Sequence, residues 1–102
     1  MSVQELKTRL DQGRRPVILD VREPWEYNIC ALPASTHIPM GQIVQRVQEL
    51  NKDDEIVVLC HHGSRSAFVA QYLQQQGFRK LYNLEGGVSA WAQHIDPSMR
   101  QY

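Results

Sequence analysis

The sequence predicts a single α/β domain over residues 1–102, with an open, mainly parallel five-stranded sheet and helices on both faces. Short apolar runs at 16–21 and 56–59 alternate with segments whose apolar residues recur at helical spacing. Such runs are typical of parallel strands, which are buried on both faces. A chain of 102 residues is also close to the commonest size of a domain with one core.

Composition argues against several functional classes. Apolar residues make up 42% of the chain and charged residues 22%, as in ordinary globular proteins, and the formal net charge is zero. Without a basic face, binding to nucleic acid or to a membrane surface is not expected. Residues 1–10 lack the apolar segment of a signal peptide and no apolar run could span a bilayer, so we expect a cytoplasmic protein.

The first helix and strand have clear boundary signals. Ser2 and Glu5 have the spacing of a capping box, and apolar residues then recur at helical intervals until Gly13, which is expected to end the helix. The apolar run 16–21 follows and predicts a strand covered on both faces.

Asp20 places an ionisable group near the carboxyl end of this strand, where open α/β sheets build their sites. Arg22 either forms a structural ion pair with Asp20 or points toward a ligand, and we favour the ion pair. Pro24 suits the first turn of a short helix, in which Trp25 and Tyr27 are expected to pack in the core or at its edge.

The alternation of strands and helices continues through the rest of the chain. The predicted elements are a short strand at 36–39, an amphipathic surface helix at 42–50, a buried strand at 56–59, a helix ended by Gly77, a strand at 80–84 and a helix at 88–93. The tail, 96–102, has no periodicity and is expected to pack loosely.

Cys60 is the main candidate for a reactive residue. It ends the apolar run 56–59, and a helical pattern begins near Ser66 after a short loop. Backbone N–H groups of such a loop can converge on one spot, and the helix dipole adds positive potential there. A cysteine pKa near about 8.5 falls to roughly 3.5 to 7.5 in such surroundings. Cys60 is therefore predicted to be a nucleophile.

The residues after Cys60 complete a predicted substrate-binding loop. Gly63 supplies the backbone freedom that lets the amides converge. Ser64 and Ser66 either donate a hydrogen bond to the sulfur or cap the following helix. Arg65 either holds the loop through an acidic partner or reaches the donor, and the sequence leaves both open.

His61 and His62 are expected to line the rim of the pocket and attract anions weakly. A metal site is not expected, because contiguous ligands point in different directions and zinc sites prefer separated pairs. A cysteine–histidine dyad of the protease type is not indicated, because no orienting acid is apparent. Cys30 has no comparable loop, so we expect buried packing for it rather than a role as a resolving or acceptor thiol.

The spacing from Cys60 to Arg65 indicates the chemistry. The loop has the form C-x4-R, one residue shorter than the C-x5-R loop of cysteine-type protein phosphatases. A smaller ring of amides suits one extra sulfur atom on Cys60 better than a tetrahedral phosphate. The spacing thus favours a persulfide over a phosphoryl intermediate.

Several motifs, taken together, resemble the rhodanese family over nearly the whole chain. They are ILDVREPWEY at 18–27, HIPM at 37–40, CHHGSRS at 60–66, GF at 77–78 and NLEGGVSAW at 83–91. At 30–35, where the family usually has Gly-His-Ile-Pro-Gly-Ala, this chain has CALPAS.

The resemblance implies a sulfurtransferase that holds sulfane sulfur on Cys60, without a metal or organic cofactor. The donor would be a small molecule such as thiosulfate, and the acceptor a thiol, a protein thiol or cyanide. Some members carry Arg or Lys where this chain has His61 and His62, so we expect thiosulfate to be a poor donor. The alternatives are a non-catalytic binding or regulatory module of the same fold, or a phosphatase or arsenate reductase.

Overall fold

The computed structural model describes all 102 residues and contains one sheet, in which every strand pair is parallel. Its strands are β1 (Val17–Asp20), β2 (Thr36–His37), β3 (Ile56–Leu59) and β4 (Leu81–Asn83), in the order β2-β1-β3-β4. All four carboxyl ends therefore meet at one edge of the sheet. The predicted α/β class with an open parallel sheet is confirmed.

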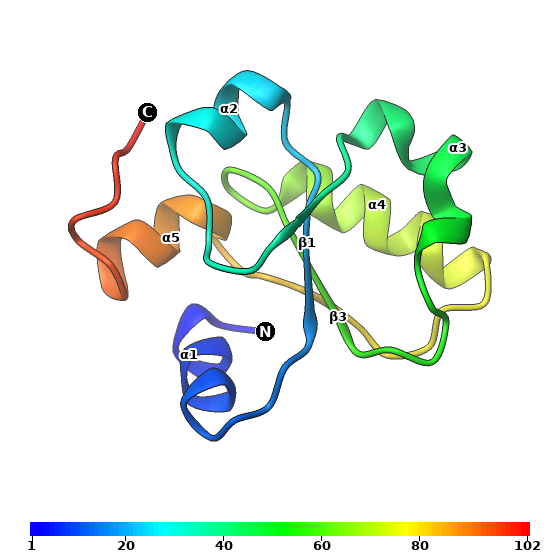
Figure 1. Cartoon of the computed structure of the whole chain (residues 1–102), viewed down its shortest axis with the longest axis horizontal. Helices are drawn as coiled ribbons and strands as arrows, with labels where there is room; N and C mark the ends of the chain where they lie inside the picture. Colours follow the sequence, from blue (N-terminus) through cyan, green and yellow to red (C-terminus); the bar gives the residue numbers. More distant parts are fainter.

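Helices cover both faces of the sheet, as predicted. They are α1 (Val3–Asp11), α2 (Pro24–Ile29), α3 (Ile43–Arg46), α4 (Ser64–Gln75) and α5 (Gly87–His94). In Figure 1, α1 and α5 lie on one side of β1 and β3, α3 and α4 lie on the other, and α2 follows the end of β1. None of these helices has the length and apolar character that crossing a membrane requires.

The central strand β3 explains how two cores form around one sheet. Its four residues are all buried and alternate between the two faces. Val57 and Leu59 belong to the cluster with α1 and α5, whereas Ile56 and Val58 belong to the cluster with α3 and α4. The continuous apolar run is thus the consequence of helices on both sides.

The expected fifth strand was wrong, because only four strands form. At the outer edge of β4, the place of a fifth strand is taken by Met1 alone. Its amino group donates to the Asn83 carbonyl (3.0 Å), and its carbonyl accepts from the Glu85 N–H (2.9 Å). Ser2 is already the N-cap of α1 and forms the predicted capping box with Glu5, so the chain leaves the sheet edge after one residue.

The single helix predicted for residues 42–50 was also wrong. This segment forms a 3-10 turn at Met40–Gln42, the short helix α3 and a second 3-10 turn at Val47–Glu49. The segment lacks a side-chain cap and contains three β-branched residues, which favour a helix less than straight side chains do. Its apolar residues still face the core as the pattern indicated: Ile43 is buried, and Val47 packs beside it.

Candidate active site

Cys60 follows β3 directly and lies at the carboxyl edge of the sheet, with 1% of the residue exposed. The chain then turns through His61, His62 and Gly63, and α4 begins at Ser64. Gly63 is the N-cap residue and has φ +117°, a value that strongly favours glycine. The sequence therefore predicted both the position of the loop and the reason for its glycine.

The first turn of α5 holds the loop from outside. The Val88 N–H donates to the Cys60 carbonyl (2.9 Å), and the Ser89 N–H donates to the His61 carbonyl (3.0 Å). In a trans peptide the carbonyl and the following N–H point in opposite directions. Because α5 fixes these two carbonyls on one side of the loop, the N–H groups of His61 and His62 are turned to the other side.

Gly87 makes this close approach possible. Its φ is +58°, and a Cβ placed on it would overlap the carbonyl oxygens of both Cys60 and His61. Any side chain would therefore push α5 away from the loop. Gly87 therefore combines a left-handed backbone angle with a close approach of two backbones.

Replacing Gly87 with alanine should open the loop. We expect Gly87→Ala to lower the free energy of unfolding by about 2 kcal/mol or more and to slow alkylation of Cys60 at neutral pH, because the loop amides lose their support. Gly13→Ala is the matched control: Gly13 has φ +82° but open space around it, so it reports the backbone cost alone. Equal losses in urea unfolding for the two variants would contradict the close-approach explanation.

The loop environment lowers the pKa of Cys60. Burial by itself raises this pKa, but hydrogen bonds from the Ser66 hydroxyl and from the N–H groups of Ser66, Gly63 and His62 outweigh that effect. The Gly63 N–H donates to Sγ at 3.1 Å. Because these hydrogen-bond donors surround the sulfur, the Cys60 thiol ionises more readily than an ordinary cysteine.

Ser66 has more acceptors than its single hydroxyl proton can serve. Its Oγ lies 3.4 Å from the Cys60 Sγ and 3.2 Å from the Gly63 carbonyl, and closest of all to Oδ1 of Asn83. Asn83 is held in this orientation because its Nδ2 donates to the same Gly63 carbonyl (3.0 Å). Asn83 therefore competes with the thiolate for the hydroxyl proton, which weakens the contribution of Ser66 relative to that of the backbone amides.

Removing the Ser66 hydroxyl should consequently have a small effect. We expect Ser66→Ala to raise the pKa of Cys60 by less than about one unit, which is within the net free energy of one hydrogen bond. The pH dependence of iodoacetamide alkylation, measured in a Cys30→Ser background, gives this pKa. A rise of more than about two units would assign the stabilisation to the hydroxyl instead of the amides.

Arg65 makes a bidentate ion pair with Glu26 of α2. Its Nη1 and Nη2 donate to the two carboxylate oxygens at 2.7 and 3.0 Å. Burial raises the pKa of Glu26, but the hydrogen bonds from Arg65 and from the Glu23 N–H lower this pKa by more than burial raises it, so the net shift is downward. Of the two roles that the sequence left open, the geometry matches the one in which Arg65 holds the loop through an acidic partner.

Loss of this partner should destabilise the protein in a pH-dependent way. We expect Glu26→Gln to lower the free energy of unfolding by about 1–3 kcal/mol at pH 7, because Arg65 is left partly buried without its counter-ion. The pKa of Glu26 is lowered in the folded state, so this contribution is present above its unfolded pKa and is lost as the pH falls through the folded pKa.

The difference between the wild type and Glu26→Gln should therefore shrink in the acid range, below about pH 4. Glu49→Gln is the control, because Glu49 pairs with Arg46 at the exposed surface, where an ion pair contributes little. A pH-independent difference in urea unfolding would show that the ion pair is not its source.

Asp20 and Arg22 are fully buried and form the ion pair that the sequence favoured. Arg22 donates to both carboxylate oxygens of Asp20, from Nε and Nη2, and Nη2 also donates to the Cys30 carbonyl at 2.6 Å. Its Nη1 donates to the Glu26 carbonyl (3.3 Å). The pair thus fixes the turn between β1 and α2, and with it the position of the carboxylate that holds Arg65. Cys30 itself packs, half-buried, against the α1 and α5 cluster.

Most of the C-terminal tail is exposed, in keeping with the expected loose packing, but its last residue returns to the site. The ring of Tyr102 stacks on His61, with 4.0 Å between centroids, and its hydroxyl accepts from Arg22 Nη1 (3.1 Å). Trp25 meets the edge of Tyr102 at 5.7 Å and is 59% exposed, so of the two expected placements the core is excluded. Burial and the neighbouring His62 lower the pKa of His61.

Sequence reasoning missed four residues that contact the loop or its supports. Glu26, Asn83 and Gly87 were quoted only as parts of longer motifs. Their roles depend on contacts with segments 20 to 39 residues away. The tail carried no signal that Tyr102 would return to His61.

Comparisons with known proteins agree with this architecture. Residues 2–94 match the model of the rhodanese-like domain. A sulfurtransferase of Allochromatium vinosum is 36% identical over 91 residues, covering 89% of this chain and 85% of that protein. YtwF of Bacillus subtilis is 38% identical over 97 residues, covering 95% and 93%. YrkF of the same organism is 40% identical over 91 residues, or 89% of this chain, but the match spans only 49% of YrkF.

Solved structures show the same fold. The crystal structure of a rhodanese-like domain protein from Staphylococcus aureus superposes with a TM-score of 0.85 at 34% identity, covering 89% of this chain and 88% of that one. The chain belongs to the rhodanese-like domain family.

Proposed function

We propose that the protein is a sulfurtransferase that carries sulfane sulfur as a persulfide on Cys60. The observation that carries this proposal is the enclosed position of Cys60 beneath amides that α5 and Gly63 turn inward. A negative charge on Cys60, or on one sulfur atom added to it, would be stabilised there. The similarity to the A. vinosum sulfurtransferase supports the same activity.

The reaction has two displacement steps. The Cys60 thiolate attacks the outer sulfur of a donor, the bond from that sulfur to the rest of the donor breaks, and the remainder leaves with the electron pair. An acceptor thiolate or cyanide then attacks the outer sulfur of the persulfide, and Cys60 leaves as a thiolate. The transfer of sulfane sulfur consumes no oxidant, because each leaving group departs with its electron pair. The loop amides stabilise the negative charge on sulfur in both steps. The cytoplasm, where we place the protein, would supply acceptor thiols.

The position of Arg65 favours sulfur transfer over phosphate chemistry. A phosphatase of the cysteine type needs its arginine at the phosphate oxygens, whereas both Nη atoms of Arg65 are bound to Glu26. Cys60 is also almost fully buried, which suits a slim terminal sulfur more than a tetrahedral group.

Thiosulfate is a poor donor in this proposal. Its two negative charges need cations at the mouth of the loop, but the charge of Arg65 is compensated by Glu26. Burial and His62 keep His61 mostly neutral at pH 7. A donor with less charge, such as an organic persulfide, fits this mouth better.

Mass spectrometry tests the proposal directly. After treatment with thiosulfate or an organic persulfide, the wild type should gain one sulfur atom on Cys60, and cyanide should remove it. Cys60→Ser should lose both reactions, whereas Cys30→Ser, the matched control, should keep them. The proposal fails if Cys60→Ser still transfers sulfur, or if the wild type hydrolyses an aryl phosphate and forms no persulfide.

A further inference from the structure

The large apolar side chains that remain exposed are confined to one end of the molecule. They are Trp25 (59% exposed), Met40 (38%), Val44 (66%), Phe68 (69%) and Tyr102 (36%), and we call this set the apolar rim. Four of them lie on the segments that leave the carboxyl ends of β1, β2 and β3, and the fifth stacks on His61. The apolar rim therefore lies on segments that begin at, or return to, the edge of the sheet where Cys60 lies.

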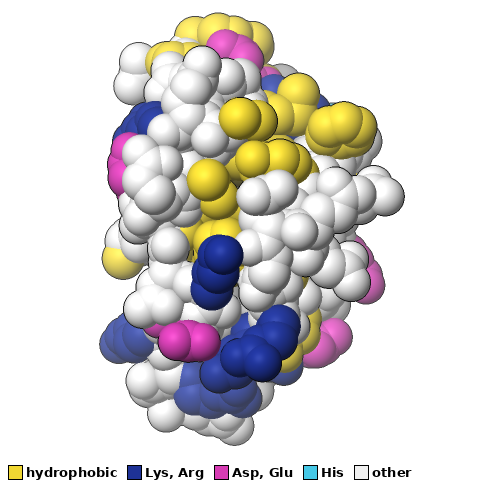
Figure 2. All heavy atoms as spheres, turned by 90° about the vertical axis from the view of Figure 1, so that its right-hand side faces the viewer, with side chains coloured by type: hydrophobic (Ala, Val, Ile, Leu, Met, Phe, Trp, Pro, Cys, Tyr) yellow, Lys and Arg dark blue, Asp and Glu magenta, His cyan; other side chains and the backbone are white.

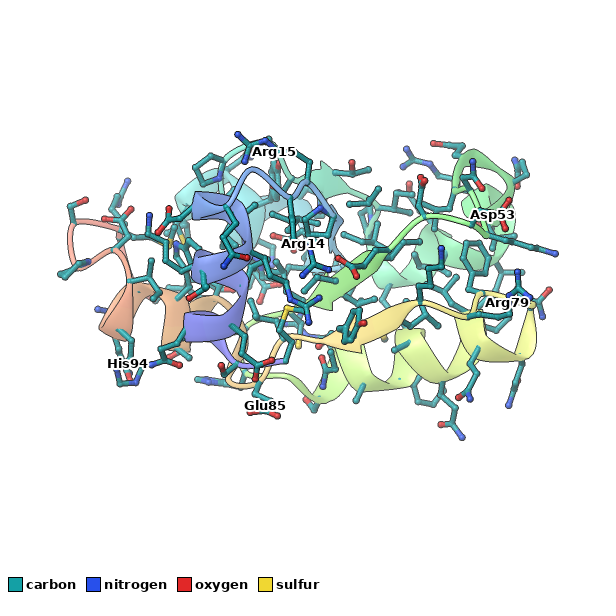
Figure 3. All side chains as sticks on the ribbon, turned by 90° about the horizontal axis from the view of Figure 1, so that it is seen from below. Arg14, Arg15, Asp53, Arg79, Glu85 and His94 are labelled. Atoms are coloured by element: carbon teal, nitrogen blue, oxygen red, sulfur yellow. The ribbon has the colours of Figure 1, made fainter.

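The opposite end of the sheet is charged instead. The loops that enter the strands carry Arg14 before β1, Asp53 before β3 and Arg79 before β4, with well-exposed side chains. Figure 3, which views the molecule from below, labels these three residues. Figure 2 shows the same polarity on the face of α3 and α4: hydrophobic side chains gather in the upper half, and most Lys and Arg side chains lie in the lower half.

Contacts around the loop relate Phe68, Trp25 and Met40 to the site. Phe68 lies three residues after Arg65 and so shares its face of α4. The side chain of Arg65 reaches Glu26, the residue next to Trp25. The N–H of Met40 donates to the Val21 carbonyl (2.9 Å), which fixes the start of the third rim segment at the end of β1.

The two arginines that lie beside the loop are compensated. Arg65 is paired with Glu26, and Arg22 with Asp20. A partner that docks here would desolvate few free charges, and exposed aromatic side chains contribute strongly to the affinity of protein interfaces. A surface with exposed apolar side chains and paired arginines beside a buried nucleophile matches an apolar protein surface better than a small anion.

We infer that the apolar rim is the docking surface for a protein acceptor, which brings a cysteine on an apolar segment to the Cys60 persulfide. The acceptor thiolate attacks the outer sulfur, the bond between that sulfur and Cys60 breaks, and Cys60 leaves as a thiolate. The inference rests on the proposed sulfur transfer, and it adds that apolar residues beside the acceptor cysteine determine the rate.

The test compares acceptors on the persulfide-loaded protein. Two cysteine peptides serve as probes, one with leucine and phenylalanine beside the cysteine and one with serine and glutamine in the same places; cyanide is the third acceptor. We expect the apolar peptide to remove sulfur from the wild type about tenfold faster than the polar peptide. In the double variant Val44→Gln, Phe68→Gln this preference should fall below about twofold, while Arg79→Gln, at the charged end, should keep it.

Each failure has a separate signature. Equal rates for the two peptides in the wild type, or a preference that persists in the double variant, would overturn the docking surface while the cyanide reaction still proceeds. No reaction with cyanide would instead overturn sulfur transfer on Cys60. A wild-type dimer in analytical ultracentrifugation that becomes monomeric in the double variant would assign the rim to a second copy of the chain and overturn the inference.

Discussion

The site depends on two hydrogen bonds between the start of α5 and the backbone of the Cys60 loop. The N–H groups of Val88 and Ser89 would otherwise need water or a side-chain cap, as at any helix N-terminus. Here they bind the carbonyls of Cys60 and His61, and so they decide which way the loop peptides face. The same contact satisfies the helix end and turns the following amides of the loop to its other side. It requires Gly87, since any side chain there would fill the space between the two backbones.

Two arginines extend this arrangement by acting on the scaffold. Arg22 is buried with Asp20 and reaches the carbonyls of Cys30 and Glu26, which fixes the turn after β1. That turn presents the Glu26 carboxylate to Arg65, and Arg65 ties the start of α4 to α2. The two positive charges are therefore used to set geometry. In the function that we propose, backbone dipoles, which do not titrate, stabilise the sulfur anion together with the Ser66 hydroxyl.

The parts of the fold that follow local rules were predictable from the sequence. The capping box at Ser2, the buried run at β3 and the left-handed turn at Gly63 each depend on a few adjacent residues. The count of five strands failed because a tertiary contact decided it: Met1 alone takes the place of the fifth strand. The helix at 42–50 failed because the segment lacks a side-chain cap and is rich in β-branched residues, while the core still accepts Ile43 and Val47 from the broken helix. Within the site, Cys60 was visible, but Asn83 and Tyr102 reach it across long stretches of sequence.

A direct titration of the Cys60 thiol, followed by the ultraviolet absorbance of the thiolate in a Cys30→Ser variant, tests the central claim most simply. If the inward-facing amides stabilise a sulfur anion, the transition should lie clearly below about 8.5, the usual pKa of a cysteine. A transition at or above that value would mean that burial dominates and that the loop does not prepare a nucleophile.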